Sequence, residues 1–180
     1  MSPDAAGPLA AYLDLLAAWN ARVNLTGART PRERVRVLVE PALRLAPHLT
    51  AGSVLDVGSG NGSPGLVLAV LQPHRQVTLL EPRLRRWAFL KEAVRAVGRL
   101  ETRVLRIRHQ EYVGPAARNV LVRGLRLAPD SLVPLLESGG QLLMSGPPRP
   151  CGNALAWQGC VGTEPLRFQR YCRRGVPRET

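Results

Sequence analysis

A glycine-rich turn that follows an acid is the part of this sequence best suited to hold a ligand. The stretch reads VLDVGSGNGSPGLVLAV over residues 54–70, and its key positions are Asp56, Gly58, Gly60 and Gly62. Glycines adopt backbone torsions that other residues resist, and they let a ligand approach the main chain closely. In an open parallel sheet, ligands bind beyond the carboxyl ends of the strands. The turn follows a predicted strand, so it is expected at that edge.

Two phosphate-binding signatures do not fit this turn. The dinucleotide fingerprint G-x-G-x-x-G needs a third glycine where Ser63 stands. A P-loop needs a lysine at the start of the following helix, and the only lysine of the chain is Lys91. What remains is Asp-x-Gly-x-Gly-x-Gly, which carries an acid and no cation. A structural turn without any ligand stays open as an alternative.

A second acid, Glu81, ends the next predicted strand, QVTLLE. A carboxylate there can accept two hydrogen bonds from a ribose diol. Together the turn and this acid resemble motif I and its partner in the class I S-adenosylmethionine (SAM) methyltransferases. That cofactor has no pyrophosphate, and its amino-acid end and sulfonium sit over the bare turn. The resemblance implies that Asp56 accepts from the cofactor's ammonium, directly or through water.

Segments flanking the turn narrow the resemblance to one family. The segments similar to the bacterial 16S ribosomal RNA methyltransferase G family are WNARVNLT (19–26), VGSGNGSPGLVLAV (57–70), RRWAFLKEAV (85–94) and VLVRGL (120–125). The likeness covers about residues 10–145, and RFQRYCRR further on could be the family's last strand. Members of that family methylate N7 of a guanosine in small-subunit ribosomal RNA.

The resemblance implies roles for individual residues. Gly58 and Ser63 would contact SAM in the turn, and His109 and Gln110 would flank its adenine. Arg123 would end the fourth strand near both cofactor and target base, which makes it the candidate catalytic residue. The candidate substrate-binding residues are Asn20, Asn24, Arg85 and Arg86.

For several of these residues a structural role competes with the functional one. A histidine without a partner specifies nothing by its chemistry alone. Asparagine most often caps or turns the backbone, and arginines on a helix often form a solvated face. An arginine that ends a strand at the ligand-binding edge has the stronger functional case.

Methylation at guanine N7 asks for few catalytic groups. The N7 lone pair is free, so no proton has to leave, and the protein mainly aligns nucleophile, methyl and sulfur. The target base is expected to be unstacked or exposed.

Exocyclic-amine methyltransferases carry an N/D-P-P-Y/F motif where this chain reads VRGLRLAP. Carbon-5 methylation needs a nucleophilic cysteine, and Cys151 follows the fifth strand, which is the wrong place.

Two other functions stay open. The second helix reads LVEPALRL, without the Asp-Ser pair of the family, and Met144-Ser145-Gly146 replaces its Lys-Gly. One alternative is therefore a degenerate paralogue that binds SAM or RNA without activity. The other is a SAM methyltransferase that acts on a small molecule or a protein, which predicts an apolar, closed pocket.

Composition favours a polyanionic partner. The formal net charge is +12, and arginine supplies nearly all of the positive charge. Basic surface attracts phosphate and speeds encounter with it, so ribosomal RNA or the small ribosomal subunit is the expected partner. The bland explanation is the codon bias of a GC-rich genome, since the chain is also rich in Ala, Leu, Gly and Pro.

Metal, membrane and secretion signals are absent from the sequence. The three cysteines, Cys151, Cys160 and Cys172, form no C-x-x-C pair, so no metal site is expected. No apolar stretch reaches the roughly 18 residues that a membrane span needs, and Asp14 interrupts the apolar segment near the N-terminus. We expect a monomeric cytoplasmic protein with no membrane partner.

The elements that must position these groups follow from hydrophobic periodicity. Helices are predicted over 8–23 and 31–46, with Pro41 ending or kinking the second. From residue 52, strands alternate with helices, the last of them DSLVPLLES, and LRFQRYCRR is predicted as an edge strand. This order predicts an α/β, Rossmann-like class I methyltransferase fold, with a mainly parallel sheet and helices on both faces. A helical N-terminal extension (1–50) would precede a SAM-binding core (51–180), the two forming one structural domain.

Overall fold

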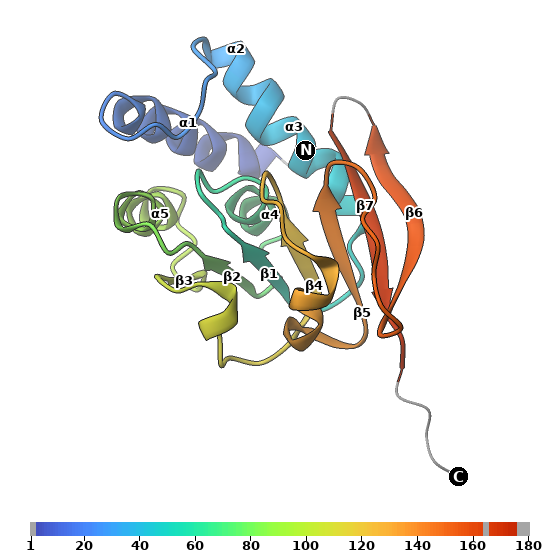
Figure 1. Ribbon diagram of the computed structural model, residues 1–180. Coiled ribbons are helices and arrows are strands. Elements are labelled where there is room, and N and C mark those ends of the chain that lie inside the picture. Colours follow the sequence, from blue (N-terminus) through green and yellow to red (C-terminus); the bar gives the residue numbers. More distant parts are fainter. Residues whose placement is uncertain (1–2, 164–165, 176–180) are drawn as a thin grey trace.

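A seven-stranded, mostly parallel sheet organises the protein in the computed structural model, which describes residues 3–163 and 166–175 (Figure 1). The strands run in the order β3-β2-β1-β4-β5-β7-β6. Their bounds are β1 Val54–Val57, β2 Val77–Leu80, β3 Arg103–Leu105, β4 Ala117–Val122, β5 Leu136–Ser145, β6 Leu155–Thr163 and β7 Leu166–Arg173. Strands β1 to β5 pair in parallel, whereas β7 is antiparallel to both β5 and β6.

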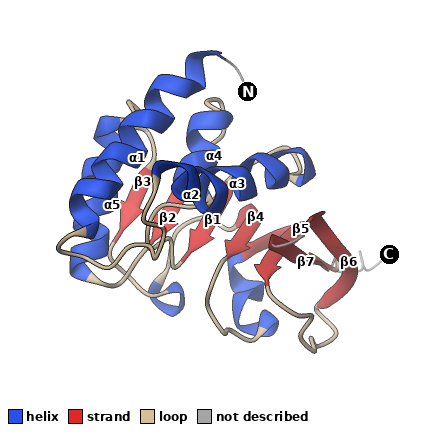
Figure 2. Ribbon diagram, turned by 90° about the horizontal axis from the view of Figure 1, so that it is seen from above, coloured by secondary structure: helices blue, strands red, loops and turns tan. Residues whose placement is uncertain are grey.

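The two faces of the sheet are covered differently. Figure 2 shows the α-helices gathered along one face. They are α1 Ala6–Asn20, α2 Pro31–Arg34, α3 Glu40–Leu45, α4 Gly65–Leu71 and α5 Leu84–Ala96. The other face carries the 3-10 helices η4 (His109–Glu111) and η5 (Pro129–Leu135), and apolar side chains of η5 join a second core cluster with β4 and β5. The predicted Rossmann-like fold is therefore confirmed, with 3-10 rather than α-helices on the second face.

Burial explains why the central elements form where they do. All four residues of β1 are buried, as expected of a strand that is covered on both faces and flanked by parallel neighbours. Helix α4 is buried along nearly its whole length, because it lies directly on β1 and β2. The glycine-rich turn between β1 and α4 is thereby fixed at the carboxyl edge of the sheet.

The sequence prediction is wrong in detail for two elements near the C-terminus. DSLVPLLES forms the 3-10 helix η5 and then enters β5, because Pro134 lacks an N–H and cannot continue an α-helix. The predicted edge strand, β7, lies inside the sheet between β5 and β6. The actual edge is β6, whose pairing is irregular between Trp157 and Cys160. Its interruption by glycines hides the alternation on which strand prediction relies.

The predicted second helix is one continuous helical run that changes its winding. Thr30 and Glu33 form a capping box, and Pro31 occupies the first turn of α2. The run then passes through a π-helical segment, Val35–Val39 (η2), before α3 and the short 3-10 helix Ala46–His48 (η3). The helical run therefore continues through Pro41 and does not end there. The π-helical segment before Pro41 accommodates the missing N–H.

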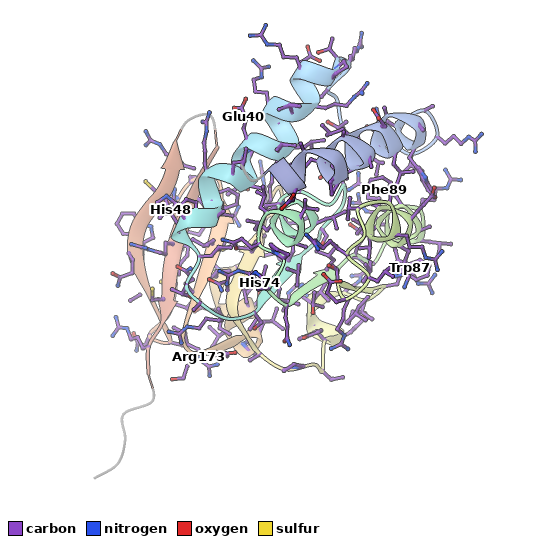
Figure 3. The ribbon with its side chains drawn as sticks, turned by 180° about the vertical axis from the view of Figure 1, so that it is seen from behind. Glu40, His48, His74, Trp87, Phe89 and Arg173 are labelled. Carbon is purple, nitrogen blue, oxygen red and sulfur yellow. The ribbon has the colours of Figure 1, made fainter. Side chains whose placement is uncertain are left out.

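Helices α1 and α5 are joined by aromatic packing. The ring of Phe89 lies 6.5 Å from that of Tyr12 and 5.9 Å from that of Trp19, measured between centroids. Phe89 is fully buried, and Figure 3 places it between α1 and α5. Helix α1 therefore shares one apolar core with the sheet. The division into an extension (1–50) and a core (51–180) stays a prediction.

We predict that Phe89→Ala lowers the free energy of unfolding by about 3–5 kcal/mol, because it leaves a cavity between the two helices. Val113→Ala is the control, since Val113 is 99% exposed and its truncation should change stability by no more than about 0.5 kcal/mol. Urea denaturation of both variants checks this. Equal stabilities for the two would contradict the packing described.

Candidate functional site

The glycine-rich turn continues β1 into the ligand-binding edge. The backbone N–H groups of Gly58 and Ser59 both donate to the carbonyl of Leu80, at 2.8 and 2.9 Å, so the turn starts as an extension of the pairing with β2. A Cβ on Gly58 would lie 2.3 Å from Cδ1 of Leu125, and Gly58 has a φ of 74°. The positive φ disfavours any other residue at this position, and a Cβ there would displace the end of the Leu125 side chain.

Asp56 lies beneath the turn. Its Oδ2 accepts a hydrogen bond of 3.1 Å from the N–H of Gly65 at the start of α4, and the residue is only 1% exposed. Burial raises the pKa of Asp56 to about 6, against the opposing effects of Ser59, Gly65 and Arg123. Its carboxylate thus holds the turn onto α4. Its contact with a cofactor ammonium stays a prediction.

Glu81 is buried at the end of β2 and faces the turn from the other side. Its Oε2 accepts from the N–H of Gly60 at 3.0 Å, and its Oε1 accepts from the N–H of Arg83 at 2.8 Å. An ionised carboxylate offers about four acceptor positions, so both oxygens keep capacity for a further donor. The two backbone bonds fix the carboxylate where the sequence predicted a partner for a ribose diol.

Arg123 joins three parts of the site. Its Nη1 donates to Oγ of Ser63 at 2.8 Å, and its Nη2 donates to the carbonyl of Val37 at 2.6 Å. Ser63 in turn donates to the carbonyl of Leu38 at 2.6 Å. Pro41 has no N–H, so the carbonyl of Val37 lacks the partner that an α-helix would supply. The guanidinium of Arg123 takes that partner's place and connects the end of β4, the glycine turn and η2.

The environment of Arg123 contains two further ionisable groups. Burial lowers the pKa of its guanidinium, while Tyr12 and Asp56 act in the opposite direction. Because the ordinary pKa of arginine is so high, the group stays protonated at neutral pH. The site therefore presents a fixed cation at the end of β4.

Two residues that the sequence reasoning did not single out complete the network. The hydroxyl of Tyr12 donates to the carbonyl of Asn61 in the turn at 2.7 Å, and burial raises the pKa of this hydroxyl well above its usual range. Nδ2 of Asn61 donates to the carbonyl of Leu25 at 3.0 Å. The signal available in the sequence was a polar residue placed among the glycines. Its partners, 36 and 49 residues away, could not be deduced.

The residues predicted to flank an adenine lie on η4. His109 is 9% exposed, its Nε2 has no hydrogen-bond partner among the described residues, and burial lowers its pKa. A buried, neutral imidazole with an unused nitrogen differs from the surface histidine that was the alternative. Gln110 is exposed. The adenine contacts of both residues stay a prediction.

The predicted substrate-binding residues divide into two kinds. Asn20 shapes the loop that follows α1: its Oδ1 accepts from the N–H groups of Leu25 and Thr26, and its Nδ2 donates to the carbonyl of Thr26. That side chain is a positioning group. Arg86 donates to the backbone carbonyl of Asn24 at 3.1 Å, which ties α5 to the same loop. The side chain of Arg85 is exposed on α5, and Asn24 is exposed too.

An open cavity of about 450 Å³ adjoins this network. It lies between the loop 25–28, the helical run from Glu33 to Leu38, and the pair Asn61 and Arg123. A cavity of about 490 Å³ exists at the opposite edge of the sheet, beside Ser53 and Arg103. Ligands of open parallel sheets bind at the carboxyl edge, so the first cavity is the functional candidate.

The model of the family "rRNA small subunit methyltransferase G" (GidB) matches residues 6–145. The chain belongs to this family. The Ribosomal RNA small subunit methyltransferase G of Xanthomonas campestris pv. campestris (strain B100) is 36% identical over 166 residues, which cover 92% of this chain and 74% of the relative. The protein of the same description from Stenotrophomonas maltophilia (strain K279a) is 38% identical over 161 residues, which cover 89% of this chain and 72% of the relative.

Solved structures support the fold of this methyltransferase G family member. An RNA methyltransferase from Salinibacter ruber in complex with S-adenosyl-L-homocysteine aligns with a TM-score of 0.60 and 17% identity, covering 84% of this chain and 97% of that one. A putative methyltransferase, yhhF from Escherichia coli, aligns with a TM-score of 0.60 and 18% identity. The alignment covers 83% of this chain and 90% of that one. At these identities the likeness shows the fold.

The described part of this methyltransferase G family chain offers neither a metal-binding cluster nor a membrane-spanning helix. No cluster of three or more His, Cys, Asp or Glu side chains there could hold a metal ion. Among those same residues, no helix has the length and apolar character to cross a membrane.

The raised pKa of Asp56 makes the stability of the protein depend on pH. The folded-state pKa of Asp56 is about 6 against an ordinary 3.8, so the folded protein binds the proton more tightly than the unfolded chain. The carboxyl's contribution to stability therefore falls as pH rises from about 4 to 6. We predict that Asp56→Asn, which keeps an acceptor for Gly65, is more stable than wild type by up to about 3 kcal/mol at pH 7. The difference should vanish below about pH 4, as measured by denaturation across pH. Parallel pH profiles for the two proteins would contradict the burial of this acid.

The carboxylate of Glu81 is predicted to contribute to SAM binding. Glu81→Gln keeps an acceptor for the N–H of Gly60 but replaces one carboxylate oxygen with a donor. We predict that it weakens SAM binding by about tenfold or more, because a charge-assisted hydrogen bond to the ribose is lost. Titration calorimetry measures this, and Glu101→Gln, an exposed position at the opposite edge, is the control. An unchanged affinity for SAM in Glu81→Gln would show that Glu81 does not bind the cofactor.

Proposed function

We propose that this protein transfers a methyl group from SAM to N7 of a guanosine in small-subunit ribosomal RNA. The observation that carries the proposal is the pair of acids on the glycine turn, with Arg123 tied to the same turn, in a chain of the methyltransferase G family. The two curated relatives are described as ribosomal RNA small subunit methyltransferases, which supports the same substrate class here.

The residues at the carboxyl edge fit SAM. The turn offers bare backbone at Gly60 and Gly62, Glu81 has acceptor capacity left for a sugar diol, and Nε2 of the buried His109 lacks a partner among the described residues. A neutral imidazole nitrogen of this kind can bond to an adenine edge. When bound, SAM would supply an activated methyl group, and a thioether would leave as the N7–CH3 bond forms.

The protein's own groups have to orient the base rather than remove a proton. Guanine N7 attacks with its free lone pair, so methyl transfer needs no general base. Arg123 is held rigidly by Ser63 and Val37, and its charge lies where the cavity meets the turn. We propose that Arg123 positions the base and the cofactor relative to each other.

Exposed arginines surround this part of the molecule. They lie on the loop and helix after α1 and at the start of α5, and are Arg22, Arg29, Arg32, Arg36, Arg83 and Arg85. Their charge attracts RNA phosphates, and its effect weakens as salt is added. The cavity beside them is open and has charged residues in its wall, which favours RNA over the apolar, closed pocket of a small-molecule methyltransferase. We propose in addition that the protein acts in the cytoplasm, where ribosomes are, as a monomer.

We predict that the purified protein transfers labelled methyl from SAM to small subunits, or to naked 16S RNA, isolated from cells that lack its gene. Reductive cleavage at N7-methylguanosine should locate the product. Arg123→Ala should lower the rate by about 100-fold, as for other fixed charges at a reacting centre. Arg103→Ala, on the opposite edge, should leave the rate unchanged.

A chain that binds SAM but labels neither substrate would be the degenerate paralogue, and the proposal would fail. Label in a protein or small-molecule fraction, with none in RNA, would favour the other alternative. Because Arg123→Ala removes the hydrogen bonds to Ser63 and Val37, its melting temperature and its affinity for SAM are measured alongside the rate.

A further inference from the structure

The cavity between the loop 25–28 and the helical run has one feature that the methyl-transfer chemistry alone does not explain. Glu33 is the one acidic side chain among its lining residues, in a region whose other charged groups are arginines. A negative charge beside a path for RNA opposes phosphate binding. A lone carboxylate in this wall therefore suits the recognition of hydrogen-bond donors better than the attraction of a backbone.

The position of Glu33 is fixed by its own hydrogen bonds. Its Oε2 accepts from the backbone N–H groups of Arg29 and Thr30, at 2.8 and 3.1 Å. Both bonds lower the pKa of Glu33, so the group is ionised at neutral pH. Because both use the same oxygen, Oε1 keeps its acceptor capacity. The carboxylate is thus held in place with one oxygen to spare.

Glu33 and Arg123 lie at different ends of the cavity. Arg123 donates to the carbonyl of Val37, four residues after Glu33 along the helical run. Asn61 and Arg123 line the end next to the glycine turn, whereas Glu33 is on α2, which Figure 1 shows at the far end of the helical run from the sheet. A base lying between these ends would present one edge to the turn and a neighbouring edge to Glu33.

Guanine is the base that satisfies both ends. Its N7 and O6 acceptors lie on one edge, and its N1–H and N2–H groups lie on the Watson–Crick edge, where other bases do not offer two adjacent donors. An ionised carboxylate is purely an acceptor, and the two lone pairs of the free Oε1 of Glu33 can accept from that pair of donors. Holding guanine by this edge leaves the N7 lone pair directed toward the turn. No group in the wall then has to bond to the atom that reacts.

We propose that this cavity is the target-base pocket and that Glu33 is its specificity residue, which accepts from N1–H and N2–H of the guanine. The inference rests on the proposed function and adds the group that reads the base. The contact also has a catalytic consequence. As the N7–CH3 bond forms, the ring becomes positively charged, so its hydrogen bonds to a carboxylate strengthen in the transition state.

A purely structural role for Glu33 in its capping box is the competing explanation, and Glu33→Gln separates the two. Glutamine also serves in a capping box, since its Oε1 can accept from the N–H groups of Arg29 and Thr30. Its amide would then present donors to the donors of guanine. The matched control is Glu40→Gln on the same helical run, labelled in Figure 3, which removes the same charge outside the cavity.

The experiment measures methyl transfer to ribosomal RNA that carries guanosine or inosine at the mapped target, assembled by splinted ligation. Inosine lacks the N2 amino group. We expect wild type to prefer guanosine by about tenfold in kcat/KM, and Glu33→Gln to lose at least tenfold in kcat on guanosine and to show little preference between the two bases. Its affinity for RNA should be equal to or tighter than that of wild type, because a negative charge is gone. Glu40→Gln should behave as wild type.

The outcomes distinguish this inference from the function on which it rests. If wild type labels no RNA, the proposed function itself fails. If wild type methylates and Glu33→Gln keeps both the rate and the guanosine preference, the pocket assignment is overturned while the function stands. A Glu33→Gln variant that loses activity, thermal stability and RNA affinity together, with its preference for guanosine intact, would show that Glu33 only caps the helix.

Discussion

The hydrogen bonds of Arg123 are the interaction on which the rest of the site depends. One guanidinium joins the end of β4, the hydroxyl of Ser63 in the glycine turn and the carbonyl of Val37 in η2. That carbonyl is available because Pro41 supplies no N–H to it. Arg123, 86 residues from Val37, thus donates the hydrogen bond that Pro41 cannot. This bond holds the wall of the cavity against the turn.

How far the sequence predicts this arrangement depends on the range of each interaction. The glycine turn and Glu81 were predictable, because strand ends and turn residues are local patterns. The alternation of strands and helices likewise predicted the parallel sheet. The links from Tyr12 to Asn61 and from Arg123 to Val37 were not, since they join residues whose proximity depends on packing. Asn20 shows the converse: the family resemblance suggested a substrate contact, its residue type suggested a backbone contact, and its hydrogen bonds are of the second kind.

The misjudged elements share a physical cause. Helix η5 contains enough apolar residues to suggest an α-helix, but Pro134 limits it to 3-10 winding. Strand β6 lacks a regular alternation, because its pairing shifts between Trp157 and Cys160. In both places backbone chemistry outweighs the hydrophobic pattern. The same is true of Pro41, where the outcome is a functional carbonyl rather than the end of a helix.

The order of the last two strands has a consequence for biosynthesis. Strand β6 is made before β7, yet β7 is the one that pairs with β5. Until the residues up to 173 have emerged from the ribosome, β6 has no neighbouring strand and one edge of β5 is unpaired. Proteins fold in part as they emerge, but this sheet has to wait for its final hairpin. Cleavage ahead of β7 would therefore remove β7 and leave β6 without a partner strand.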